Sequence, residues 1–181
     1  ASQGNLREAK DFYARAILNR PEYLEARLNL AGVLQKEGKG DEAIAQYREV
    51  LRLKPDYWQA SYKLGIELAR RGKDSEAEGC FAHVVQLRPD YASGHFNLGV
   101  VLAQQKRMEQ AIFHFREALR LEPANRQAQQ YLEAALKLLE NPQPLPLHGA
   151  AHLLVHRGGG RPFPHRILER EEIVKPNLPQ Q

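Results

Sequence analysis

The apolar residues of this chain recur three and four positions apart between its glycines and prolines, as an amphipathic helix requires. Leu64, Gly65 and Leu68 share one helical face, where the small glycine lets a neighbouring helix approach closely. Asp41 and Asp74 stand where a helix start needs a side-chain acceptor for its free backbone N–H groups. The pattern predicts helices at residues 5–19, 22–36, 40–53, 56–70, 74–87, 90–104, 108–121 and 124–139.

These helices repeat with a period of 34 residues, which is marked by Pro21, Pro55, Pro89 and Pro123. Each proline follows an apolar turn and ends a helix, because it cannot continue the backbone hydrogen bonding. Alanines and aromatic residues keep the same step, at Ala9, Tyr13, Ala43, Tyr47, Ala77, Phe81, Ala111 and Phe115. Such a period is typical of a repeat architecture, in which stacked units bind partners along a surface.

These residues resemble the tetratricopeptide repeat family, whose pattern is an aromatic, Leu-Gly, a large residue, Ala-x3-aromatic and then Pro. The chain departs from it at the first aromatic, where it has Arg27, Ser61 and His95. The resemblance covers residues 4–140 and implies an all-α fold. The expected fold is a right-handed solenoid of helical hairpins, with three full repeats between an N-terminal half repeat and a C-terminal capping helix.

The two ends of the chain depart from the period. We expect two parts, a solenoid over residues 1–140 and a Pro/Gly/His-rich linker or tail over residues 141–181 that packs weakly. The first helix has no partner before it, and its apolar residues are Phe12, Tyr13, Ala16 and Ile17. The chain therefore reads as a piece of a longer protein, and end-to-end self-association is expected at high concentration.

Composition argues against several classes of function. The net charge is +4, and no Lys/Arg block with interleaved aromatics suggests a nucleic-acid surface. No run of 18 apolar residues predicts a membrane span. The single cysteine, Cys80, excludes an internal disulfide and is expected to pack as a small hydrophobe. The compartment is not identified, with the cytoplasm favoured.

Few residues of this sequence are candidates for catalysis or metal binding. The residues His148, His152 and His156 have the spacing of a metal-binding helical face, but flanking prolines and glycines favour a solvated tail. His83, His95 and His114 each stand alone in a helix and are expected to pack or face solvent. No phosphate loop or catalytic triad can be argued from linear order. We predict no enzyme, no cofactor and no metal site.

The remaining candidate is a peptide-binding groove. In the family that the chain resembles, the first helix of each pair lines a concave face. Counting about 100° per residue places a set of polar and apolar residues there. They are Asn29, Gln59, Tyr62, Lys63, Ile66, Arg70, Phe96, Asn97, Val100 and Gln104. Packing between repeats is the alternative for Tyr62 and Phe96.

Asn29 and Asn97 resemble the asparagine ladder of O-linked N-acetylglucosamine transferase, which grips peptide backbone. Here the ladder is broken at Lys63 and ends at Tyr131. The sequence therefore predicts a protein–protein interaction scaffold that binds an unidentified extended peptide or protein segment. The alternative is the substrate-recognition region of a larger enzyme such as a protein O-glycosyltransferase, and a metal-responsive adaptor using the histidine tail is a weaker third.

Overall fold

The computed structural model describes residues 2–140, and these residues form helices joined by short turns. The predicted all-α class is confirmed, since no strand occurs in this part of the chain. Residues 141–181, the expected tail, lie outside the described residues. The helices are α1 (Ser2–Asn19), α2 (Leu24–Lys36), α3 (Gly40–Leu53), α4 (Trp58–Arg70), α5 (Asp74–Leu87), α6 (Ala92–Gln104), α7 (Met108–Leu121) and α8 (Arg126–Glu140).

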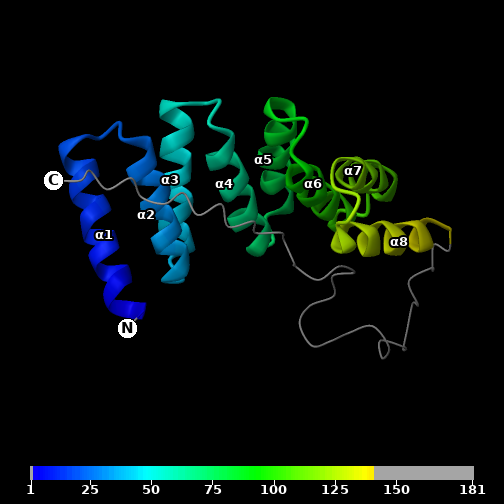
Figure 1. Cartoon of the computed structure of the whole chain (residues 1–181), viewed down its shortest axis with the longest axis horizontal. Coiled ribbons are helices and arrows are strands. Elements are labelled where there is room, and N and C mark those ends of the chain that lie inside the picture. Colours follow the sequence, from blue (N-terminus) through cyan, green and yellow to red (C-terminus); the bar gives the residue numbers. More distant parts are fainter. Residues whose placement is uncertain (1, 141–181) are drawn as a thin grey trace.

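The helices stack in the order of the sequence, from the blue α1 to the yellow α8 (Figure 1). The most extensive contacts between helices join α2 to α3, α4 to α5 and α6 to α7. These are the three predicted helical hairpins. The half repeat α1 packs on α2, and α8 packs on α7. No described helix is long and apolar enough to cross a membrane.

Turns of one kind join the two helices of each hairpin. Gly38 and Gly72 have φ values of 76° and 73°, and Lys106 adopts the same left-handed conformation with a φ of 63°. In each case the backbone N–H of the following residue donates a hydrogen bond to the carbonyl oxygen five residues before it, as from Lys39 to Leu34 at 2.8 Å. The conformation is strained for a side chain other than glycine, so the turn geometry overrides the local preference at Lys106.

The predicted capping role of the two aspartates is wrong. The N-cap residues of α3 and α5 are Lys39 and Lys73, and neither makes a side-chain capping bond. Asp41 and Asp74 lie inside the first turns instead, where a carboxylate interacts favourably with the helix dipole. Asp41 also accepts a hydrogen bond from Arg71 of the next hairpin at 2.6 Å.

The core explains why Leu-Gly recurs on the first helix of each pair. A Cβ atom placed on Gly65 would lie 2.8 Å from the Phe81 ring, and one on Gly99 would lie 2.6 Å from the Phe115 ring. Both rings are fully buried. The glycine and the aromatic residue therefore act as one pair, in which the missing side chain makes room for the ring.

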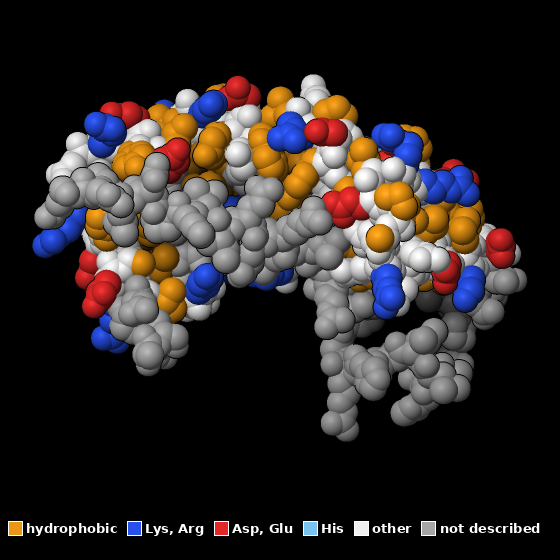
Figure 2. Space-filling view, viewed as in Figure 1, with side chains coloured by type: hydrophobic (Ala, Val, Ile, Leu, Met, Phe, Trp, Pro, Cys, Tyr) orange, Lys and Arg blue, Asp and Glu red, His pale blue; other side chains and the backbone are white. Residues whose placement is uncertain are grey.

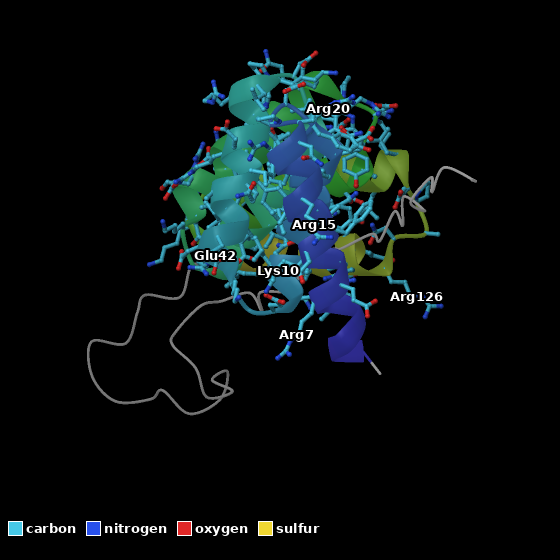
Figure 3. The ribbon with its side chains drawn as sticks, turned by 90° about the vertical axis from the view of Figure 1, so that its left-hand side faces the viewer. Arg7, Lys10, Arg15, Arg20, Glu42 and Arg126 are labelled. Carbon is cyan, nitrogen blue, oxygen red and sulfur yellow. The ribbon has the colours of Figure 1, made fainter. Side chains whose placement is uncertain are left out.

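The two end helices differ in what they expose. On α1, Phe12 is 60% and Leu18 is 81% exposed. Figure 3 looks onto this end, where Arg7, Lys10 and Arg15 lie along α1. End-to-end association through this surface stays a prediction.

At the other end, α8 carries the exposed Glu133 in the register of Gly65 and Gly99. A glutamate at this position leaves no room for an aromatic ring of a following helix to pack against α8 as Phe81 and Phe115 pack against Gly65 and Gly99. This substitution is what a capping helix requires.

Candidate peptide-binding groove

The first helices of the hairpins form the inner layer of the stack. Contacts link α4 with α6 and α6 with α8, while no comparable packing joins the second helices α3, α5 and α7 to one another. In a curved stack the inner elements crowd together and the outer ones spread apart. The inner face is therefore the one carried by α2, α4, α6 and α8.

Three equivalent polar residues follow one another on this layer. Asn29, Lys63 and Asn97 occupy the same place on α2, α4 and α6. Asn29 and Lys63 are half-buried, and neither makes a side-chain hydrogen bond or ion pair within the described residues. The amide of Asn97 is buried and donates to the Tyr62 hydroxyl at 3.0 Å. Asn97 is therefore tied to the preceding hairpin in a way that Asn29 is not.

The two aromatic residues of the candidate set lie in ring clusters between repeats. The Tyr62 ring packs edge-on against Phe81 and Tyr91, with centroids 6.0 and 5.2 Å apart. Burial raises the pKa of the Tyr62 hydroxyl. Packing between repeats, the alternative left open from the sequence, thus applies to Tyr62.

Phe96 has the same role one repeat further on. Its ring contacts Phe115 and Tyr131, with centroids 5.9 and 5.3 Å apart. Ile66 and Val100 are also buried in the hydrophobic core. Contact of these four side chains with a peptide stays a prediction.

The other three polar residues of the set, Gln59, Arg70 and Gln104, lie at the helix ends. Arg70 is exposed, and its guanidinium lies 4.0 Å from the Glu67 carboxylate, while Gln59 and Gln104 are half-buried. Glu67 also accepts from Arg71 at 3.0 Å and from Gln35 at 3.1 Å, so it links two hairpins. On the face shown in Figure 2, basic, acidic and apolar side chains are interspersed along the whole solenoid.

At the position of the family's first aromatic residue, each hairpin of this chain has a polar residue that contacts a polar residue on the second helix. Arg27 on α2 donates to Gln46 on α3 at 3.1 Å, and Ser61 on α4 lies 2.9 Å from the His83 ring on α5. On the third hairpin, His95 Nδ1 lies 3.1 Å from His114 Nδ1.

His95 and His114 are each the only histidine of their helix and are packed, as expected, but they contact each other across the hairpin, which the sequence alone did not predict. The signal that was missed is their place in one repeat, on the facing sides of its two helices. No group of three or more potential metal ligands occurs in residues 2–140, and the histidines of the tail lie outside this range.

Cys80 is poorly placed for nucleophilic chemistry. It is partly buried on α5, and burial, followed by the charge of Glu76, raises the pKa of its thiol to about 11. We expect alkylation by iodoacetamide at pH 8 to be about 100-fold slower than for an ordinary thiol, because the thiolate is the reactive form. Mass spectrometry of the folded and urea-unfolded chain tests this. Equal rates in the two states would contradict it.

Two models of the tetratricopeptide repeat family match the chain, one over residues 92–125 and the other over residues 1–64. The fold and the sequence period thus define a solenoid of helical hairpins, and the chain belongs to the tetratricopeptide repeat (TPR) family. Proteins of this family are in general interaction scaffolds rather than enzymes. No curated protein matches the chain in a sequence search.

Solved structures share this fold. The crystal structure of MamA is 20% identical with a TM-score of 0.72, over 77% of this chain and 81% of that chain. YrrB, described as a TPR protein with an unusual peptide-binding site, is 25% identical with a TM-score of 0.65, over 73% and 68%. A mutant of the Thermobaculum terrenum O-GlcNAc transferase is 31% identical with a TM-score of 0.57, over 62% of this chain and 22% of that one.

Proposed function

We propose that the chain is a protein-interaction scaffold that binds an extended peptide along its inner face. The observation that carries this proposal is that Asn29 and Lys63 stand at one register position on successive inner helices without a side-chain partner within the described residues, while Asn97 at the same position is buried. A carboxamide offers both an N–H donor group and a carbonyl acceptor, which match the C=O and N–H of a peptide unit. The likeness to YrrB, whose description names a peptide-binding site, supports the same class of ligand.

Charge on the inner face favours an acidic ligand. Lys63 makes no ion pair within the described residues, and Arg70 is exposed at the end of the same helix. An acidic segment would meet both cations. Each backbone hydrogen bond contributes about 0.5–1.5 kcal/mol, so a few such bonds with some apolar contact give about micromolar affinity. Binding should weaken with added salt, because exposed charges are screened.

The test is binding of fluorescent peptides, pairing an acidic extended sequence with a basic one of equal length. We expect the acidic peptide to bind more tightly and Asn29→Ala with Lys63→Ala to weaken it about tenfold or more. Neither side chain has a hydrogen-bond or ion-pair partner among residues 2–140, so the fold should be unaffected. Gln86→Ala, on the exposed outer side of α5, is the matched control and should bind normally. Equal binding by the double variant and the control would move the site away from the inner face.

Asn97→Ala is expected to change the stability of the fold as well as peptide binding, which the sequence alone did not indicate. It removes the bond to the buried Tyr62 hydroxyl, which also interacts with Tyr91 and Ser93. A fold cost of about 0.5–1.5 kcal/mol accompanies any loss of binding. The melting temperature of this variant must therefore be recorded beside its affinity.

The second candidate is the substrate-recognition region of a protein O-glycosyltransferase. The observation that favours it is the likeness to the O-GlcNAc transferase, together with asparagines on the inner helices. A glycosyltransferase fold encoded further along the same reading frame would decide for this candidate. Under it, the peptide would be a substrate segment and the inner face would serve the same binding role.

A further inference from the structure

The third hairpin brings two imidazole rings head to head. His95 on α6 and His114 on α7 have their Nδ1 atoms 3.1 Å apart and their ring centroids 5.4 Å apart. The rings are inclined by 33°. His95 is buried and His114 is half-buried, so the pair lies inside the hairpin with access from the His114 side.

Hydrogen bonding fixes the tautomer of His95. Its Nε2 lies 3.2 Å from the Pro89 carbonyl oxygen, which can only accept, so Nε2 carries the proton. The Nδ1 atom of His95 then presents a lone pair, and His114 Nδ1–H donates to it. Burial, followed by the neighbouring His95, lowers the pKa of His114 to about 4, so this ring is neutral at pH 7.

We propose that His95 and His114 form a two-histidine binding site for a divalent transition-metal ion, with Zn²⁺ as the reference ion. The ion binds between the two Nδ1 atoms. Zn²⁺ binds imidazole nitrogen at about 2.0–2.1 Å, and tetrahedral geometry then holds two such nitrogens about 3.3–3.4 Å apart. The observed separation of 3.1 Å must widen by a few tenths of an ångström, and both rings must turn so that their Nδ1 lone pairs converge on the ion instead of on each other.

The surroundings of His95 match those of metal-bound histidines. Such histidines usually donate their other ring N–H to a carbonyl or carboxylate, which orients the ring. His95 already makes this bond to Pro89. Binding requires the His114 proton to move from Nδ1 to Nε2. That change is a tautomerisation of a neutral ring, so no net proton is released.

Solvent reaches the pair from the His114 side, because His114 lines a surface groove and the buried His95 does not. This groove of about 280 Å³ is also lined by Leu98, Leu102 and Phe113. Its acidic residue, Glu78, is held by Arg107 at 2.6 Å and so is already paired. The site therefore supplies two protein ligands, and water completes the coordination.

The experiment is Zn²⁺ titration by calorimetry on the full chain carrying asparagine at the four tail histidines. These are His148, His152, His156 and His165. In this background we expect one Zn²⁺ site, weakened about tenfold or more by His95→Gln or by His114→Gln, because each removes a ligand. His83→Gln, in the hairpin before, is the matched control and should bind as the background does.

Nitrogen-15 NMR of the imidazole rings supplies a readout that does not depend on variants. Zn²⁺ should shift the Nδ1 resonances of His95 and His114 together and leave those of His83 in place. This settles the proposal even if a glutamine variant fails to fold. No Zn²⁺ binding in the background protein, or an equal loss for His83→Gln and His114→Gln, would overturn it.

Discussion

Phe115→Ala is expected to lower the free energy of unfolding by about 3–5 kcal/mol, the usual cost of emptying a buried aromatic position. Phe115 is fully buried on α7 and lies at the meeting point of α6, α7 and α8. Its ring centroid is 5.9 Å from that of Phe96 and 5.8 Å from that of Tyr131. Removing it therefore loosens one whole hairpin together with the capping helix.

The matched control is Phe113→Ala, on the same helix two residues away. Phe113 is 59% exposed, so its replacement should change stability by no more than about 0.5 kcal/mol. Urea unfolding followed by circular dichroism gives both values. Amide hydrogen exchange should place the loss for Phe115→Ala in α6–α8, since each repeat depends mainly on its neighbours. Equal effects of the two variants would contradict this account of the core.

The stacked helical hairpins could be predicted from the sequence, because residues that contact each other between helices recur with the 34-residue period. A small residue on the first helix and an aromatic on the second recur in step, and Gly65 with Phe81 form the contact that this step implies. Every predicted helix is present, with its ends shifted by a few residues. Local signals were weaker at the helix starts, where lysines take the N-cap positions and turn geometry decides the boundary.

For the candidate site, the sequence predicts only which residues share a face of one helix. Counting positions around a helix assigns Asn97 to the inner layer, but the partner of its amide is Tyr62, 35 residues earlier. The contact between His95 and His114 likewise depends on how two helices face each other across a hairpin. Such pairs follow from three-dimensional packing, and helical periodicity within one element cannot supply them.

Gly99→Ala is expected to destabilise the chain although alanine favours helices more than glycine does. The gain in helix propensity is about 0.8–1.0 kcal/mol. Against it, the new Cβ would lie 2.6 Å from the Phe115 ring and 3.2 Å from the Ala111 carbonyl oxygen. Neither a fully buried ring nor a helix backbone can move away cheaply, so overpacking costs about 3 kcal/mol, near the top of its usual range. The net loss should be about 2 kcal/mol.

Gly79→Ala supplies the control for this prediction. Gly79 lies within α5, and a Cβ there would meet nothing within 4 Å, so the same substitution should stabilise by about 0.5–1 kcal/mol. The decisive measurement is a double-mutant cycle in urea unfolding. Once Phe115→Ala has removed the ring, Gly99→Ala should cost little or even stabilise, giving a coupling of about 1–3 kcal/mol. Additive effects would mean that the glycine is not there to seat the ring, and the Leu-Gly repeat would need another explanation.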